Sequence, residues 1–292
     1  MFEGFERRRV AAREVEINLV TGGAGPALLL LHGYPQTHAI WHRVAPLLAD
    51  GFTLVCPDLR GYGDSGKPAP DQPNVAYSKR TMARDMVEIM AALGHERFLL
   101  CGHDRGARVA YRLALDHPDR VVRLATLDVI PTWEEFSQPG RAAALGKFHW
   151  YFLAEPAPFP EETIGRDPDH FLRYLLDKWS GTPGCFAPEA LAEYLRCFRD
   201  PATIAATCAD YRAGATVDFD LDDADRTAGR RIACPMLALW GGRGRRSGVV
   251  EVWRHWASDV RGRALDCGHF LPEEAPEETA AELAAFFRGA PG

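Results

Sequence analysis

Residues 98–110 constrain the fold of this 292-residue chain more than any other stretch. An apolar run, Phe-Leu-Leu-Cys, leads into the turn Gly-His-Asp-Arg-Gly, and a helical pattern begins near Arg105. A short apolar run of this kind is predicted to be a buried strand, so only a few residues join strand and helix. Gly102 and Gly106 lack Cβ atoms where the two elements must crowd together. The segment therefore predicts a strand–turn–helix unit that lifts Asp104 above the end of a sheet.

Short apolar runs and helical patterns alternate along most of the chain. Strands are expected at residues 27–32, 53–57, 97–102, 121–127, 235–240 and 262–266, and helices at 40–49, 78–93, 107–117, 248–258 and 277–287. This alternation predicts βαβ units and a mostly parallel sheet with helices on both faces. Residues 11–21 are expected to add an antiparallel edge strand. The sequence therefore predicts an α/β fold.

The alternation stops between residues 131 and 231. This stretch is rich in aromatic residues and is punctuated by prolines. We expect a helical insertion packed as a lid over the carboxyl edge of the sheet, where ligands bind in open α/β sheets. The chain is thus divided into a core, residues 1–130 and 232–292, and a helical cap, residues 131–231. The alternative is a structural appendage with a core of its own.

Charge and cysteine content exclude several classes of protein. The net charge of −6 argues against a nucleic-acid partner, because phosphate binding needs clustered positive charge. Seven cysteines without a CxxC pair argue against a disulfide framework and for a reducing compartment. No signal peptide, membrane-spanning run or clustered metal-ligand spacing is present. We expect a cytoplasmic protein that acts on a small molecule without a metal or cofactor.

Asp104 occupies the nucleophile position of a G-x-nucleophile-x-G elbow, where most such elbows carry serine. An ionised carboxylate needs no base to attack carbon, and it forms an ester intermediate. This chemistry suits displacement at sp³ carbon, where the leaving group is a halide or an epoxide oxygen. The alternative is that Asp104 only caps the following helix. The flanking glycines and the apolar strand favour the nucleophile.

The elbow resembles the nucleophile elbow of the α/β-hydrolase fold, and this resemblance indicates its partners. His269 follows the last predicted strand, where that fold places its histidine. The turn at residues 240–245 lacks the carboxylate that many members place there, so Asp128, at the end of strand 121–127, is expected to orient His269. The alternative for Asp128 is a turn residue.

The same fold places an oxyanion hole at the turn His-Gly-Tyr-Pro, residues 32–35. The backbone N–H groups of Tyr34 and Arg105 would then stabilise charge on the ester intermediate. Two such donors are worth about 3–4 kcal/mol each.

The sequence further resembles the fluoroacetate dehalogenases, a branch of the α/β hydrolases close to epoxide hydrolases and haloalkane dehalogenases. The resemblance covers nearly the whole chain. Its motifs are GHDRGAR at 102–108, HGYPQTH at 32–38, DLRGYGDS at 58–65, KFHW at 147–150, DYRAG at 210–214 and GHFLP at 268–272. It implies an α/β-hydrolase fold with a helical cap inserted after strand 6, and it suggests a homodimer.

The resemblance also implies the roles of the substrate-binding residues. Arg105 and Arg108 would bind the substrate carboxylate, and their i, i+3 spacing places both guanidinium groups on one helix face. The alternative is that Arg108 is a surface residue. His149, Trp150 and Tyr211 would hold the departing halide through N–H and O–H groups. Trp179 is considered as a pocket residue but is given no role.

The implied activity is hydrolytic dehalogenation of short 2-haloacids, such as fluoroacetate or chloroacetate, to glycolate and halide. One alternative is an epoxide hydrolase with the same triad, in which Tyr211 and a second lid tyrosine, from Tyr151, Tyr174 or Tyr194, act as acids. Another is a non-catalytic binding relative, which needs no complete triad. Arg108 separates the first two, because a neutral epoxide requires no second cation.

Overall fold

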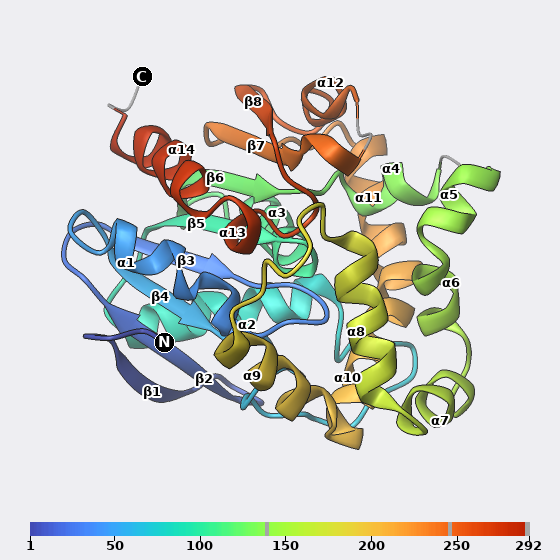
Figure 1. The fold of residues 1–292 in the computed structure, drawn as a ribbon. Coiled ribbons are helices and arrows are strands. Elements are labelled where there is room, and N and C mark those ends of the chain that lie inside the picture. The colour runs from blue at the N-terminus through green and yellow to red at the C-terminus, as the bar shows by residue number, and fades with distance from the viewer. Residues whose placement is uncertain (138–139, 245–246, 290–292) are drawn as a thin grey trace.

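A twisted eight-stranded sheet runs through the computed structural model, which describes residues 1–137, 140–244 and 247–289 (Figure 1). The strand order is β1-β2-β4-β3-β5-β6-β7-β8. The β1–β2 and β2–β4 pairs are antiparallel, and the other neighbours are parallel. The strands are β1 (Glu6–Ala11), β2 (Glu16–Gly22), β3 (Ala27–Leu31), β4 (Thr53–Pro57), β5 (Phe98–His103), β6 (Val121–Leu127), β7 (Met236–Gly241) and β8 (Val260–Leu265). The predicted α/β class with a mostly parallel sheet is confirmed.

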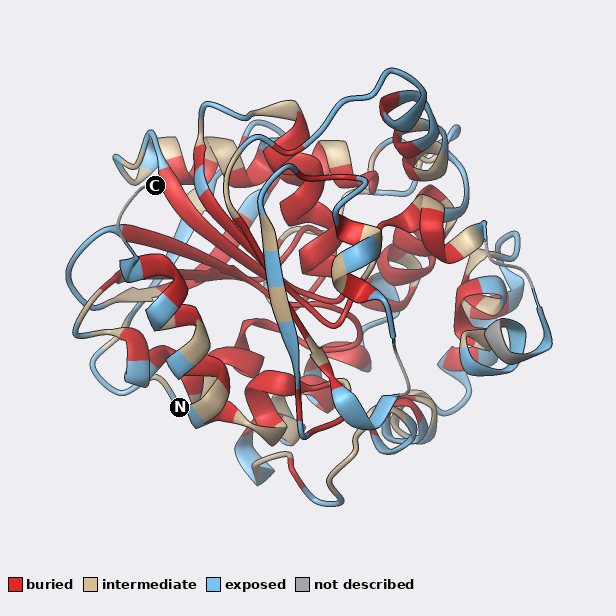
Figure 2. Ribbon diagram, turned by 90° about the horizontal axis from the view of Figure 1, so that it is seen from above, coloured by how far each residue is buried: buried red, intermediate tan, exposed pale blue. Residues whose placement is uncertain are grey.

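Helices cover both faces of this sheet, and the inner strands, such as β3 and β5, are buried between them (Figure 2). One face is covered by η1 (His38–His42), α1 (Val44–Leu48) and α14 (Pro276–Arg288), and the other by α2 (Lys79–Ala92), α3 (Arg105–Asp116) and α12 (Val249–Trp253). In β3, Leu28 and Leu30 pack on the face covered by η1, α1 and α14, and Leu29 and Leu31 pack on the face covered by α2, α3 and α12. Successive side chains of a strand point to opposite faces, so an uninterrupted apolar run fills both cores.

The first strands differ from the sequence-based expectation. Residues 11–21 were expected to form one edge strand, but they span the turn between β1 and β2, and β1 is the edge. The expectation was wrong because β1, Glu-Arg-Arg-Arg-Val-Ala, carries almost no apolar signal and is exposed along most of its length. Charged side chains suit an edge strand, since they discourage pairing with another chain.

Two expected helices are also shorter than predicted. The window at residues 40–49 divides into η1 and α1 around Arg43, and the window at 248–258 contains only α12. Arg245, part of the turn that lacks a carboxylate, lies outside the described residues.

The segment between β6 and β7 is helical and lies to one side of the sheet in Figure 1. Pro168, Pro188 and Pro201 each begin a helix there, as expected for a residue that lacks an N–H group. The helices are α4 (Thr132–Phe136), α5 (Arg141–Gly146), α6 (Phe148–Ala154), α7 (Phe159–Gly165), α8 (Pro168–Trp179), α9 (Pro188–Phe198), α10 (Pro201–Ala215) and α11 (Val217–Thr227).

Buried residues of these lid helices, such as Leu172 and Tyr194, belong to the same apolar cluster as the α2 and α3 face of the sheet. The helices therefore share the core of the sheet instead of forming a separate one. The division into a core at residues 1–130 and 232–292 and a cap domain at 131–231 stays a prediction. Within the described chain, no helix is both long and apolar enough to span a membrane.

Candidate active site

Asp104 lies in the sharp turn between β5 and α3. Its backbone has φ 48° and ψ −119°, a conformation that costs a non-glycine residue about 1–3 kcal/mol. A Cβ on Gly102 would lie 2.4 Å from the Gly106 carbonyl oxygen, and one on Gly106 would lie 2.2 Å from that of His32. Only glycine fits at either position. The predicted strand–turn–helix unit is confirmed, and its backbone is strained at Asp104, the central residue of the turn.

Backbone and side-chain groups surround the carboxylate of Asp104. The Tyr34 N–H donates a hydrogen bond of 2.9 Å to Oδ1, and Oδ2 lies 3.8 Å from His269 Nε2. Burial disfavours the charged form, but His269, Arg105 and Arg108 outweigh burial and lower the pKa of Asp104. The carboxylate is therefore ionised at neutral pH.

Asp128 and His269 meet at the carboxyl edge of the sheet. Asp128 Oδ2 lies 2.6 Å from His269 Nδ1, and Oδ1 accepts the Gly241 N–H at 3.1 Å. Asp128 directly follows β6 and has φ 55°, which turns the chain sharply after the strand. The structure thus brings together the three residues that the sequence suggested as a triad.

The loop that carries His269 is held from the lid side. The His269 N–H donates to the Trp179 carbonyl oxygen at 3.0 Å. The carboxylate of Glu274, at the end of α13 (Leu271–Glu274), accepts the N–H groups of Gly181, Gly268 and Phe270 at 2.8, 2.9 and 3.0 Å. The sequence reading missed Glu274, because the two loops it joins meet only in the tertiary structure.

Arg105 is fully buried and faces α10. Its Nε and Nη2 atoms donate to the carboxylate of Asp210 at 3.2 and 2.6 Å, and its guanidinium carbon lies 4.1 Å from the Tyr211 ring centroid. Nη1 is buried and has no hydrogen-bond partner among the described residues. The sequence suggested that Arg105 and Arg108 fork around one carboxylate. The Nε and Nη2 atoms of Arg105 are already bonded to Asp210, so Nη1 is the nitrogen of its guanidinium that has no partner among the described residues.

Arg108 lies one helical turn further along α3 and is also buried, so the alternative that it is a surface residue is wrong. Its Nη1 donates to the Ile130 carbonyl oxygen at 3.0 Å and to Thr132 Oγ1 at 3.2 Å. Its guanidinium lies 4.4 Å from the Trp150 ring centroid, and Nη2 lies 3.7 Å from Glu135 Oε1.

A cavity of about 580 Å³ is lined by residues from both the core and the lid. Its wall includes six of the residues suggested from the sequence, Asp104, Arg108, Asp128, His149, Trp150 and His269, together with Trp179. Tyr34, Arg105 and Tyr211 are not among the residues that line it, but Tyr211 packs against His149, which does. The Tyr211 ring centroid is 5.7 Å from that of His149 and 5.2 Å from that of Tyr34.

The lid contributes polar atoms that lack partners. His149 Nδ1 and the Tyr211 hydroxyl are buried and make no hydrogen bond to any described residue. Burial lowers the pKa of His149 to about 3, so its ring is neutral. Burial also raises the pKa of Tyr211 well above its usual value, so its hydroxyl stays protonated. Both side chains can therefore donate a hydrogen bond to a ligand.

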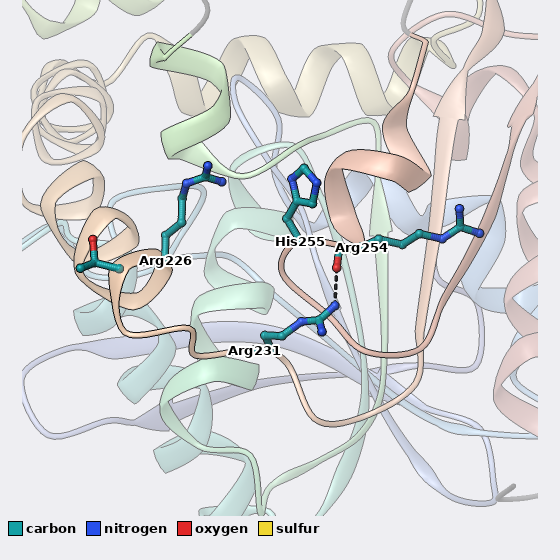
Figure 3. A pocket seen from close by; sticks show the side chains of 5 residues that line it. Arg226, Arg231, Arg254 and His255 are labelled. Carbon is teal, nitrogen blue, oxygen red and sulfur yellow. Dashed lines mark hydrogen bonds between the residues drawn. The ribbon is translucent and has the colours of Figure 1, made fainter.

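A second hollow of about 510 Å³ lies away from these groups, on the surface near α11 and α12 (Figure 3). It is lined by Arg226, Thr227, Arg231, Arg254 and His255. Arg231 donates to the backbone carbonyl oxygens of Arg254 and Ala257, and the Arg254 side chain points away from Arg226. Among the described residues, its lining includes no carboxylate. Over the described ranges, no three His, Cys, Asp or Glu side chains are grouped to hold a metal ion.

Known proteins share both the sequence and the architecture. Residues 26–276 match a family model described as alpha/beta hydrolase fold. A fluoroacetate dehalogenase from Burkholderia sp. is 51% identical over 99% of this chain and 96% of its own length. A soluble epoxide hydrolase from Corynebacterium sp. (strain C12) is 36% identical over 89% of this chain and 90% of its own. The crystal structure of a protein assigned to the α/β hydrolases, from Nostoc sp. PCC 7120, superposes with a TM-score of 0.97 at 52% identity, covering 99% of this chain and 100% of that one.

Proposed function

The chain belongs to the α/β-hydrolase fold family, and from this premise we propose that it hydrolyses short 2-haloacids, such as fluoroacetate and chloroacetate, to glycolate and halide. One observation carries the proposal: the ionised carboxylate of Asp104 and the buried cation of Arg108 face the same cavity. A carboxylate nucleophile attacks carbon, and a buried guanidinium at its side selects a substrate that carries a negative charge.

The first step is displacement of the halide. Arg108 and Nη1 of Arg105 hold the substrate carboxylate, and Asp104 attacks the carbon that bears the halogen. Oδ1 of Asp104 is bound by the Tyr34 N–H, so Oδ2 is the attacking oxygen. The halide leaves toward His149, Trp150 and Tyr211. The neutral His149 ring and the protonated Tyr211 hydroxyl can stabilise it by donating hydrogen bonds.

The second step is hydrolysis of the ester on Asp104. Oδ1 becomes the ester carbonyl oxygen, and the Tyr34 N–H already bound to it stabilises the charge that develops there. The Arg105 N–H is the second donor. His269 Nε2 lies 3.8 Å from Asp104 Oδ2 and takes a proton from the water that attacks the ester carbonyl carbon. The bond from that carbon to the glycolate oxygen then breaks, the proton on His269 passes to the departing oxygen, and Asp104 regains its carboxylate. Asp128 orients the ring and stabilises its protonated form.

The geometry gives less support to an epoxide hydrolase. That reaction would use Tyr211 and a second lid tyrosine as acids. Tyr151 and Tyr174 are each 47% exposed, and the Tyr194 hydroxyl donates to Glu273 at 2.5 Å. None of the three belongs to the cavity wall formed by the described residues. A non-catalytic role is also less well supported, because such a protein needs no aligned His269 and Asp128.

Of the remaining expectations, only the homodimer rests on the family resemblance. A cytoplasmic location, a homodimer and a cap formed by residues 131–231 stay predictions.

The test compares three substrates of matched size with the purified protein. Halide release is measured with fluoroacetate, chloroacetate and chloroacetamide, which has the same carbon–chlorine bond without the carboxylate, and diol formation is measured with a small epoxide. We expect halide from the two acids and far slower release from chloroacetamide. Diol formation faster than halide release would favour the epoxide hydrolase, and the absence of both products would favour a non-catalytic protein.

A further inference from the structure

A cluster of buried charges lies where α10 meets the core of the protein. It consists of Tyr62, Lys79, Arg105, Asp210 and Asp218, and each of them is at most 4% exposed. Two cations and two carboxylates make the cluster formally neutral. A buried ion pair is favourable only when its geometry and hydrogen bonds compensate for desolvation, so this arrangement needs an explanation.

Asp210 is the centre of the cluster. Its Oδ2 accepts the Tyr62 hydroxyl at 2.6 Å and Arg105 Nε at 3.2 Å, and its Oδ1 accepts Lys79 Nζ and Arg105 Nη2. Arg105 and Lys79 overcome the effect of burial and lower the pKa of Asp210 far below its usual range. Asp210 is therefore ionised at any working pH, and both of its oxygens are held.

This carboxylate fixes the orientation of Arg105. The Nε–Nη2 edge faces Asp210, and Nη2 also donates to the Asp210 carbonyl oxygen at 2.7 Å. The Tyr211 ring covers the guanidinium, and a Cβ on Gly214 would lie 3.0 Å from Nη2. Three neighbouring positions of α10 thus enclose Arg105. The remaining nitrogen, Nη1, has no partner among the described residues.

Asp210 also fixes the backbone next to Tyr211, the residue proposed to bind the halide. Asp210 directly precedes Tyr211, whose buried hydroxyl lacks a partner within the described chain. Lys79 ties Asp210 to α2, and it also donates to Asp218 Oδ2 at 3.1 Å. The backbone segment that carries Tyr211 is therefore anchored to the core through Asp210.

We propose that Asp210 is a positioning residue: it aims Arg105 Nη1 at the substrate carboxylate and holds Tyr211 beside the leaving group. This inference rests on the proposed function, because it assumes that Arg105 binds a carboxylate. Asp210 acts through Arg105 and Tyr211 and does not itself touch the substrate.

The test is the substitution Asp210→Asn, with Asp218→Asn as the matched control. Both changes remove one buried carboxylate charge and a bond to Lys79, but only Asp210 contacts Arg105. The first readout is the inhibition constant of acetate, which carries the carboxylate but no leaving group. We expect Asp210→Asn to raise it about 10-fold or more and Asp218→Asn by less than about 3-fold, because only the first frees the guanidinium to turn away.

The second readout separates positioning from general damage to the fold. In Asp210→Asn, kcat/KM for chloroacetamide should fall only through the displacement of Tyr211, and kcat/KM for chloroacetate should fall much more, because it also depends on Arg105. Equal losses on the two substrates, or equal acetate inhibition constants in the two variants, would overturn the inference.

A milder variant covers the case in which Asp210→Asn does not fold. Tyr62→Phe removes a single hydrogen bond from Asp210 Oδ2 and leaves Arg105 in place. We expect a rise of about 2- to 5-fold in the acetate inhibition constant, and an unchanged constant would overturn the inference. If the unaltered protein neither releases halide nor binds acetate, the proposed function fails and this inference fails with it. If the unaltered protein does both, a negative result in the variants refutes only the role of Asp210.

Discussion

The core and lid halves of the active-site cavity differ in how their polar atoms are satisfied. On the core side, Asp104 Oδ1 accepts the Tyr34 N–H, and Asp128 joins His269 to the Gly241 N–H. On the lid side, His149 Nδ1 and the Tyr211 hydroxyl have no partner among the residues described. The side chains of Asp104, Asp128 and His269 are thus held before a substrate arrives, whereas the lid donors, like Nη1 of Arg105 on the core side, have no partner among the residues described.

The difference has a physical meaning. A buried polar atom without a partner costs about 1–3 kcal/mol, so proteins rarely keep one without a reason. Groups that do chemistry on a bound intermediate must be positioned in advance. Groups that receive a leaving halide must have unused donors, because the halide becomes their partner. Four predictions test this division, in order of decreasing effect.

The largest effect is expected when the core half loses its nucleophile. In Asp104→Asn the amide cannot attack carbon, and turnover of chloroacetate should fall by about 10³-fold or more. Asn tolerates positive φ values, so the elbow should persist. Halide release measures the loss, and circular dichroism checks the fold. The control Asp266→Asn alters an exposed carboxylate beside Arg243 and should leave turnover unchanged. Substantial turnover by Asp104→Asn would contradict the proposed mechanism.

Replacing the proposed base should separate the two reaction steps, halide displacement and ester hydrolysis. His269→Asn keeps the nucleophile and the lid donors, so it should release at most one halide per active site and then stop. The ester on Asp104 should accumulate, because water is no longer activated. Mass spectrometry of the intact protein after mixing with chloroacetate would detect it. If turnover stops and no adduct forms, His269 is not the hydrolytic base.

In the lid half, we expect the loss of one donor to lower activity and to raise stability. Tyr211→Phe removes a buried hydroxyl that has no partner in the described chain, so the free energy of unfolding should rise by about 1 kcal/mol. Halide release should fall about 10- to 100-fold, with a larger loss for fluoride than for chloride, because fluoride depends more on donated hydrogen bonds.

Tyr111→Phe is the matched control for stability. The Tyr111 hydroxyl is equally buried but donates to Asp222 at 2.7 Å, so its removal should destabilise the protein. Urea melts of both variants measure the sign. A Tyr211→Phe variant that loses stability as Tyr111→Phe does would show that the hydroxyl is structural.

The smallest effect on turnover is expected at the contact between lid and core that lies apart from the chemistry. Burial raises the pKa of Glu273 to about 7, although the Tyr194 hydroxyl of α9 opposes the rise by its hydrogen bond. Between about pH 4.5 and 7 the folded protein holds a proton that the unfolded chain has lost. The contribution of Glu273 to stability should therefore fall as pH rises through this window, by about 3 kcal/mol in total, and then stay level. It is obtained as the difference between the unaltered protein and Glu273→Gln, because buried neutral histidines such as His149 change stability in the opposite direction.

Urea melts at pH 5, 6, 7 and 8 measure this slope. Glu273→Gln should flatten it and stabilise the protein at pH 8. Glu278→Gln, at an exposed position of α14, should leave it unchanged. If Glu273→Gln keeps the slope of the unaltered protein, Glu273 does not hold the proton.

Local patterns in the sequence were sufficient wherever the decisive residues are neighbours in the chain. Gly102 helps to predict the elbow because a Cβ there would meet the Gly106 carbonyl oxygen, four residues along the chain, whereas the conflict at Gly106 is with His32 and is visible only in the tertiary structure. Asp128 could be suggested because it directly follows a predicted strand. The edge strand β1 was missed because its charged sequence lacks the apolar alternation by which a strand is predicted.

The sequence by itself determined the fold class, and it suggested the nucleophile and the order of the proposed triad, because each of these depends on residues at the ends of predicted strands. Only the tertiary structure decided how Arg105 is oriented, since its partner Asp210 comes from a helix 105 residues away. It also decided that Glu274 joins the loops of Gly181 and Gly268. Buried charges find partners through space, and the cost of desolvation makes those partners obligatory. For this reason, the sequence indicates which residues react, and the packing of lid against core decides where their donors point.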